Sequence, residues 1–207
     1  MDIKTIIQRI VIFLFVIILF LYSVLFYYKS QREQEAQEFI YPSVVEFEKG
    51  KFYNALYGAS TITHGFYSFM LKYYDTYAGN TSRIYAGVCF INLGQYELGI
   101  KCLLSAKVKG KIMESKVLSF LGDAYMCIKD YTRALDFYLK AASIYDNDID
   151  TPLFLFKAVF AYEKLEKYDM ALSLLEDILS KYKNSEKYSE FLAEKKTLDF
   201  VVKHKNK

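Results

Sequence analysis

Few side chains in this chain have a type and spacing that could do chemistry. Only two histidines occur: His64 precedes a glycine at a helix start and His204 lies in a lysine-rich tail, so we interpret the first as a capping or surface residue and the second as solvated. The sequence has no phosphate-binding glycine loop, no G-x-S-x-G and no H-E-x-x-H. We therefore expect no enzyme, no catalytic residue, no cofactor and no small-molecule substrate.

The three cysteines, Cys89, Cys102 and Cys127, do not form a recognisable site. Their number is odd and none stands in C-x-x-C spacing, which argues against a disulfide framework or a zinc site. All three lie in helical patterns, and free cysteine packs as a small hydrophobe, so we expect buried, inert thiols. The alternative is a single disulfide between two of these cysteines, if the domain is extracytoplasmic.

The acidic residues between Asp146 and Asp150 alternate like the start of a calcium-binding loop. Thr151 stands where that loop requires glycine, and Lys157 stands where it requires a bidentate glutamate. We therefore expect a solvated connector and no metal site. Thr151 and Pro152 have the pattern of an N-cap followed by a first-turn proline, so the next helix should begin there.

The elements that would position any site begin with an apolar run from Ile10 to Tyr28. Its nineteen residues carry no charge, and fifteen of them are Ile, Leu, Val or Phe. At ~1.5 Å per residue a helix of this length spans ~28 Å, close to the ~30 Å hydrocarbon core of a bilayer. No small-residue cleavage pattern follows the run, so we expect an uncleaved signal anchor with Tyr22, Tyr27 and Tyr28 at the membrane interface.

Basic residues flank this run on both sides, with Lys4 and Arg9 before it and Lys29 and Arg32 after it. An uncleaved first apolar segment preceded by basic residues favours residues 1–9 in the cytoplasm and the large domain outside. We therefore expect a single-pass protein of the inner (plasma) membrane with its domain on the extracytoplasmic or periplasmic side.

The residues after the anchor have the composition of one helical domain. The formal net charge of the chain is +3 with both signs mixed, whereas nucleic acid requires a concentrated basic face, so we expect no nucleic acid partner. Only two prolines occur, and apolar residues recur with helical spacing. The domain should therefore be all-α.

Three segments of this domain, beginning at Ile84, Ser119 and Phe156, align without gaps. Each has a small or slim pair, an aromatic residue three positions after that pair, a second aromatic residue six positions later, and another small residue three positions beyond that. The matched positions recur 35 and then 37 residues apart: Ala86-Gly87, Leu121-Gly122 and Ala158-Val159; Phe90, Tyr125 and Tyr162; Tyr96, Tyr131 and Tyr168; Gly99, Ala134 and Ala171. Small residues let two antiparallel helices approach closely, so each segment should be a helical hairpin that stacks on the next.

This pattern resembles the tetratricopeptide repeat (TPR). The unit from Leu118 to Ala141 is the best match. The third unit departs from the family pattern at Val159, at Glu166 where a turn glycine is common, and at Ile178, so its packing should be looser. The fold implied is an N-terminal transmembrane helix followed by a TPR-like α-hairpin solenoid.

Weaker signals complete the predicted organisation. Gly50 to Leu56 has the turn and small residue of a degenerate first unit, and a helical stretch from His64 to Tyr77 should close at Gly79-Asn80. Ser185 should cap a last helix that shields the open end of the stack. The predicted parts are a cytoplasmic tail (1–9), the anchor (10–28), a juxtamembrane helix with the degenerate unit (29–81), three TPR-like repeats (82–183), and a capping helix with a basic tail (184–207).

The order of these parts, from the anchor through YAGVCFINLGQYE and LGDAYMCIKDYTRAL, is similar to the YfgM-type membrane-anchored TPR proteins of bacteria. The resemblance implies a non-enzymatic interaction module that associates with Sec translocon subunits and assists folding or trafficking of exported proteins. An alternative is a dedicated assembly scaffold in an unrelated cell-envelope complex, because fold alone does not set function.

The candidate site is the concave face formed by the first helix of each hairpin. An apolar groove there would suit hydrophobic stretches of a client or a partner helix. The carboxylate clamp of cytosolic co-chaperones is not expected, because apolar residues replace its Lys and Asn. In the alternative interpretation the apolar residues are core, and the chain's own 64–77 helix covers Ile84 and Val88. Phe156 and Phe160 lie farther from that helix and should be exposed. The groove positions are Ile84, Val88, Ile91, Met126, Phe156 and Phe160.

Overall fold

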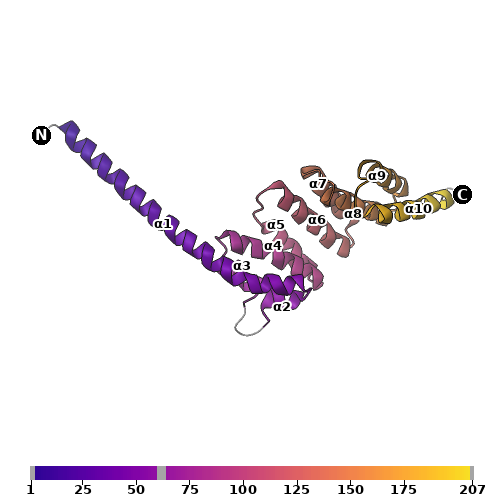
Figure 1. Cartoon of the computed structure of the whole chain (residues 1–207), viewed down its shortest axis with the longest axis horizontal. Helices are drawn as coiled ribbons and strands as arrows, with labels where there is room; N and C mark the ends of the chain where they lie inside the picture. The colour runs from indigo at the N-terminus through magenta and orange to yellow at the C-terminus, as the bar shows by residue number, and fades with distance from the viewer. Residues whose placement is uncertain (1–2, 60–63, 206–207) are drawn as a thin grey trace. The chain divides into compact units, whose positions relative to one another are not determined.

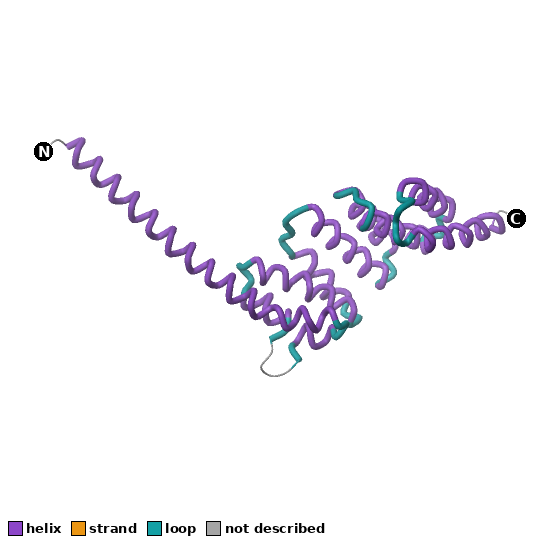
Figure 2. The backbone as a smooth tube through the Cα atoms, viewed as in Figure 1, coloured by secondary structure: helices purple, strands orange, loops and turns teal. Residues whose placement is uncertain are grey.

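The computed structural model describes residues 3–59 and 64–205, and over these residues the chain forms ten helices and no strand (Figures 1 and 2). The all-α fold class predicted from the sequence is confirmed. The chain divides into two compact units, residues 1–83 and residues 84–207.

Unit 1 is built on α1 (Ile3–Glu48), a single helix of 46 residues that contains Pro42. Its N-terminal part extends away from α2 (Phe52–Tyr57) and α3 (Phe66–Lys72), as Figure 1 shows in indigo. Along residues 10–28 every side chain is exposed except Val24, which is half-buried. An 18-residue window of α1 has a mean hydropathy of 3.0, so the helix is long and apolar enough to cross a membrane.

The helix break after α3 does not lie where the sequence pattern placed it. The prediction that a helix closes at Gly79-Asn80 is wrong: α3 ends at Lys72, and α4 (Tyr77–Asn92) begins after a four-residue turn and runs through both residues. Thr76 starts this helix, because its Oγ1 accepts the backbone N–H of Gly79 at 2.9 Å. A Cβ on Gly79 would overlap the carbonyl oxygen of Tyr73, so the glycine permits a close approach and does not end a helix.

Unit 2 consists of helical hairpins at the positions that the repeat predicts. The second helices begin at the three aligned tyrosines, Tyr96, Tyr131 and Tyr168. The hairpins pair α4 with α5 (Tyr96–Ser105), α6 (Lys111–Cys127) with α7 (Tyr131–Ile144), and α8 (Asp150–Lys164) with α9 (Tyr168–Lys181), and α10 (Tyr188–Lys205) follows.

Small residues allow the close helix contacts within these hairpins, as expected. A Cβ added to Gly99 would lie 2.9 Å from the carbonyl oxygen of Gly87, so the backbones of α4 and α5 are nearly in contact. A Cβ on Gly122 would overlap the ring of Tyr138, which occupies the space that the missing side chain leaves. Glycine is therefore required at these crossings for packing.

Two helix starts differ from the predictions. Thr151 is not an N-cap: α8 begins at Asp150, and the side chain of Asn147 accepts the N–H of Ile149 at 3.0 Å and that of Asp150 at 2.7 Å. An Asx turn thus starts the helix two residues earlier than the Thr-Pro pattern indicates. The last helix begins at Tyr188, three residues after Ser185, whose Oγ accepts only the N–H of Lys187 at 3.4 Å.

The cysteines divide by burial. Cys89 and Cys102 are buried, and burial raises the pKa of the Cys89 thiol to about 12, so this thiol is unreactive at neutral pH. Cys127 is exposed at the end of α6, so the expectation of a buried thiol is wrong there. All three are free.

The turn between the two helices of each hairpin uses a left-handed backbone. Gly94, Lys129 and Glu166 occupy the same repeat position with φ of 77°, 63° and 57°, and Gly50 has φ of 71° before α2. Glycine adopts this conformation without steric cost, whereas a residue with a Cβ does not. Lys129 and Glu166 therefore hold the turn at a cost in free energy.

Lys129→Gly should stabilise unit 2 by about 0.5–1 kcal/mol, because relief of the left-handed strain exceeds the extra entropy that glycine gives the unfolded chain. Urea denaturation followed by circular dichroism would measure the change. The matched control is Lys129→Ala, which removes the same side chain but keeps the Cβ and should give no gain. Equal effects of the two substitutions would contradict the conformational explanation.

Candidate interaction surface

A polar cluster joins three helices of unit 2, α6, α7 and α8. Asp123 on α6 accepts the hydroxyl of Tyr138 on α7 at 2.8 Å and pairs with Nζ of Lys157 on α8 at 2.8 Å. Lys157 also donates to Oγ of Ser119 at 3.2 Å. Burial, together with the neighbouring Asp123 carboxylate, raises the pKa of Tyr138, so the tyrosine remains a neutral donor. The cluster fixes α6 beside α8.

An apolar patch adjoins this cluster. Met126 follows Asp123 by three residues on α6, and Phe160 follows Lys157 by three residues on α8. Residues three apart on a helix lie on one face, so Met126 shares the face of α6 that carries Asp123, and Phe160 shares the face of α8 that carries Lys157. Phe160 is 37% exposed and Met126 is half-buried. We call Asp123, Met126, Lys157 and Phe160 the α6–α8 face.

Phe156, predicted to be exposed beside Phe160, is buried at 6% exposure, so that prediction is wrong. Its ring centroid lies 4.7 Å from that of Phe160 on one side and 4.7 Å from that of Phe191 on the other. Phe191 belongs to α10 and is fully buried. The last helix thus covers Phe156 and leaves Phe160 as the aromatic residue of this pair that a partner could contact.

The groove positions on α4 contribute little accessible surface. Ile84 and Val88 are 8% and 9% exposed, and Ile84 packs with Leu103 and Val117 from the following helices. Ile91 is half-buried against the same cluster. Of the six predicted groove residues, Phe160 is exposed, Ile91 and Met126 are half-buried, and Ile84, Val88 and Phe156 are buried.

Sequence reasoning missed Lys157 and Tyr138 as parts of this surface. The sequence pattern identifies Lys157 only as a residue that excludes a calcium loop. In the aligned second and third repeats Lys157 matches Phe120 and Asp123 matches Phe160, so the spacing does not predict the ion pair that the fold forms.

Glu163 lies one turn beyond Phe160 and is strained electrostatically. Its Oε1 is buried and has no hydrogen-bond partner among the described residues. Burial raises the pKa of this carboxyl group, the nearby Glu194 adds to the shift, and Lys164 opposes it. The charged form of Glu163 therefore destabilises the folded state.

Glu163→Gln should raise the melting temperature at pH 7 by about 2–4 °C, because it removes a partly buried, unpaired charge whose desolvation costs about 1 kcal/mol. The sign of the pH dependence follows from the raised pKa: the wild-type protein has its full stability below the unfolded-state value of 4.5 and loses stability as pH rises through the folded-state pKa. The gain from Gln should therefore shrink at pH 4. Melting curves at the two pH values measure it, and a gain independent of pH would contradict the assignment to charge.

Within residues 3–59 and 64–205 no group of three or more His, Cys, Asp or Glu side chains could hold a metal ion. The aspartates of the 146–150 connector have other surroundings: Asp146 pairs with Lys181 at 2.6 Å and accepts the hydroxyl of Tyr182 at 2.7 Å, and Asp150 lies 3.7 Å from Lys116.

Comparison with known proteins agrees with this geometry. Residues 117–149, which cover most of α6 and all of α7, match the tetratricopeptide repeat family, and this is the unit that the spacing singled out. A crystal structure of nearly identical TPR-like repeats from a putative kinesin light chain of Podosopora anserina superposes with a TM-score of 0.58. It shares 10% sequence identity, and the match covers 83% of this chain and 93% of that one. At this identity the likeness concerns the fold alone. No curated protein matches the chain. The chain therefore contains a tetratricopeptide repeat within a TPR-like helical solenoid, a fold whose members generally bind proteins.

Proposed function

We propose that this chain is a non-enzymatic, single-pass membrane protein whose repeats hold a protein partner beside the membrane. The observation that supports it is the continuity of α1: the exposed apolar run and the part that packs with α2 and α3 belong to one helix. Because no break separates them, insertion of the run would tether the whole chain.

The partner proposed is an exported protein emerging at the Sec translocon, on the extracytoplasmic side of the inner membrane. This assignment rests on the resemblance to YfgM-type proteins and on the basic residues before the anchor. The small α6–α8 face suits weak, short contacts with apolar segments, since Met is adaptable and Phe160 offers one exposed ring. Tethering raises the effective concentration at the membrane, so weak contacts suffice.

Photo-crosslinking in intact membranes tests the surface and the partner together. A photoreactive phenylalanine analogue at Phe160 should capture translocon subunits and exported proteins. The same analogue at Met170 is the matched control, because Met170 is exposed on α9, the second helix of its hairpin. Equal capture at both positions would overturn the α6–α8 face as the site. Capture of one unrelated envelope complex at constant ratio would replace the translocon proposal by the dedicated scaffold.

The exposed thiol of Cys127 reports the side of the membrane. In spheroplasts, a membrane-impermeant maleimide should label the native protein once, at Cys127, while the buried Cys89 and Cys102 react only after unfolding. Cys127→Ser should abolish the native labelling. Labelling that requires lysis would place the repeats in the cytoplasm and exclude contact with exported clients.

A further inference from the structure

The apolar run of α1 ends close to the turn between α3 and α4. Ser43 donates to the carbonyl of His64 at 2.9 Å, before the start of α3, and Arg32 donates to the carbonyl of Lys72 at 2.7 Å, at its end. From the first contact to the second, the residue number falls along α1, from 43 to 32, while it rises along the segment that holds α3, from 64 to 72. The helix α3 therefore runs antiparallel to α1, and its C-terminal end points toward the apolar run.

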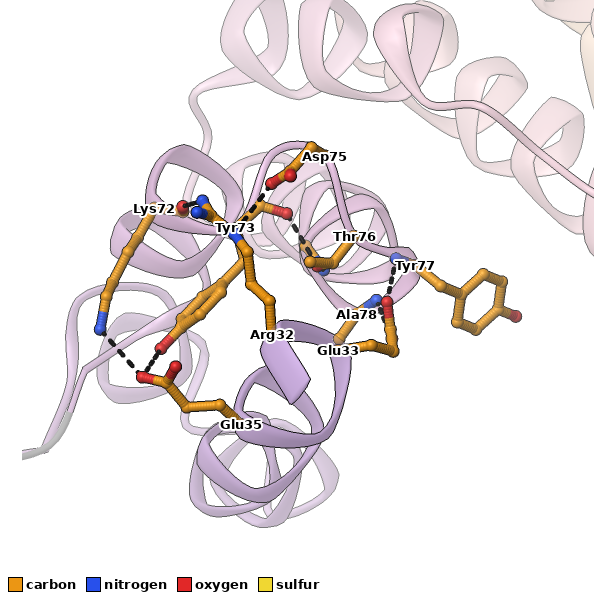
Figure 3. A network of polar contacts seen from close by, with 10 residues as sticks. Arg32, Glu33, Glu35, Lys72, Tyr73, Asp75, Thr76, Tyr77 and Ala78 are labelled. Atoms are coloured by element: carbon orange, nitrogen blue, oxygen red, sulfur yellow. Dashed lines mark hydrogen bonds and ion pairs between the residues drawn. The ribbon is translucent and has the colours of Figure 1, made fainter. Parts of the chain in front are cut away.

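A set of polar contacts fixes residues 72–78, which we call the α3–α4 corner, to α1 (Figure 3). Glu33 accepts the backbone N–H of Tyr77 at 2.6 Å and that of Ala78 at 2.9 Å, and so caps α4. Arg32 pairs with Asp75 at 3.1 Å.

The next turn of α1 adds a third contact. Glu35 accepts the hydroxyl of Tyr73 at 2.7 Å and lies 3.5 Å from Lys72. The hydrogen bond from Tyr73, with the charge of Lys72, holds the pKa of Glu35 below its usual range, so the contact is charged at neutral pH. The corner is thus bound to α1 at Arg32, Glu33 and Glu35.

The position of these contacts sets the depth of the corner. Arg32 follows Tyr28, the last residue of the apolar run, by four residues, or ~6 Å along a helix. The headgroup regions add about 5–7 Å to each side of the hydrocarbon core. If the run spans the core, the α3–α4 corner lies in the headgroup layer.

The space between α1 and the corner has the polarity gradient of a phospholipid. A cavity of about 820 Å³ opens there. Leu25 and Tyr28 line its apolar end, and its polar end holds two cations and two anions: Lys29, Arg32, Glu35 and Asp75. Arg32 and Asp75 pair with each other, and Glu35 is held by Tyr73 and Lys72, so the cavity presents balanced charge. Balanced charge suits a zwitterionic headgroup better than an anionic one.

Exposed tyrosines lie on both elements that border this cavity, α1 and the corner. Tyr74 in the corner is 67% exposed, Tyr77 is 58% exposed, and Tyr28 on α1 is 69% exposed. The ring of Tyr77 points away from the polar contacts in Figure 3. Tyrosine concentrates at the headgroup level, because its ring has an apolar body and a polar tip.

We propose that the α3–α4 corner docks into the headgroup layer of the membrane that α1 spans, with zwitterionic phospholipid headgroups filling the cavity beside Tyr28. The inference rests on the anchoring proposed above. Docking at a second point, beside the helix itself, holds unit 1 in one orientation on the bilayer.

The chain has no tryptophan, so single Trp substitutions report depth without background. The full-length protein in phosphatidylcholine nanodiscs would be examined with a quencher at the headgroup level and one in the acyl region. Leu19→Trp tests the anchor and Tyr74→Trp tests the corner. Tyr53→Trp is the matched control: Tyr53 is 63% exposed on α2, where Asn54 donates to Glu46, fourteen residues beyond Arg32 on α1 and ~21 Å farther from the core.

The shallow quencher should quench Tyr74→Trp several-fold more than Tyr53→Trp, and the deep quencher should quench Leu19→Trp. Equal quenching at positions 74 and 53, with Leu19→Trp quenched, would overturn docking and leave the anchor standing. An unquenched Leu19→Trp would overturn the anchor itself. If Tyr74→Trp disturbs folding, quenching of Tyr77→Trp measures the depth of the same corner instead.

Adding anionic lipid should leave the quenching of Tyr74→Trp unchanged, because the cavity carries balanced charge. Docking that requires anionic lipid would overturn the zwitterionic assignment.

Discussion

Phe156→Asp should unfold the C-terminal helices of unit 2, whereas Phe160→Asp should leave them folded. Phe156 packs among Val159, Leu175 and Phe191 in the largest cluster of this unit. The substitution removes a buried aromatic ring, which costs about 3–5 kcal/mol, and adds a carboxylate with no partner. Phe160 is already 37% exposed, so Asp there can reach water and should cost less than about 1.5 kcal/mol.

Thermal melts followed by circular dichroism would separate the two variants. Phe156→Leu is the second control, because it keeps an apolar side chain and should lose less stability than Phe156→Asp. A native-like melt for Phe156→Asp would show that Phe156 is not core. Since Phe156→Asp perturbs the fold, Phe160→Asp alone is the variant with which to test partner binding.

The hairpins could be predicted from the sequence because their determinants are local. The small residue, the aromatic residue and the turn recur at fixed spacing, and each acts on a neighbour within about one hairpin, as Gly122 does beneath Tyr138. The turn conformation at Lys129 and Glu166 also follows from the repeat, even though these residues lack the glycine of Gly94.

The accessible surface could not be predicted in the same way, because it depends on what packs over each position. The spacing places Phe156 on the inner side of α8, but the covering residue, Phe191, lies 35 residues later on a helix outside the repeat pattern. Likewise Cys127 lies in a helical pattern, yet it ends α6 at a place that no later helix covers.

The start of α4 was missed for a related reason. Thr76 caps this helix locally, but its other cap, Glu33, is 44 residues away from Tyr77 in the sequence, on a helix predicted only as a juxtamembrane segment. Without that cap, Gly79 and Asn80 have the local pattern of a helix end. Tertiary contacts override the local signal here, and the same contacts form the α3–α4 corner.

Gly79→Ala should therefore have a large effect on unit 1. The new Cβ would overlap the carbonyl oxygen of Tyr73, and both groups are held by backbone geometry, so the corner must move. We expect a loss of about 2–4 kcal/mol, comparable to other overpacking substitutions with no flexible side chain to yield. Thr81→Ala, two residues further along α4 at a half-buried position, is the control and should cost less than about 1 kcal/mol.

Hydrogen exchange localises the effect. In Gly79→Ala the amides of Tyr77 and Ala78 should lose protection, because displacing the corner separates them from the Glu33 carboxylate, while amides of α6 and α7 keep theirs. Unchanged protection at Tyr77 would mean that the corner accommodates a side chain, and the close approach would then not explain the glycine. Combined with Tyr74→Trp in nanodiscs, the same substitution should also reduce quenching by the shallow quencher, because a corner released from α1 no longer has a fixed depth. The packing of one glycine would then determine how the domain lies against the membrane.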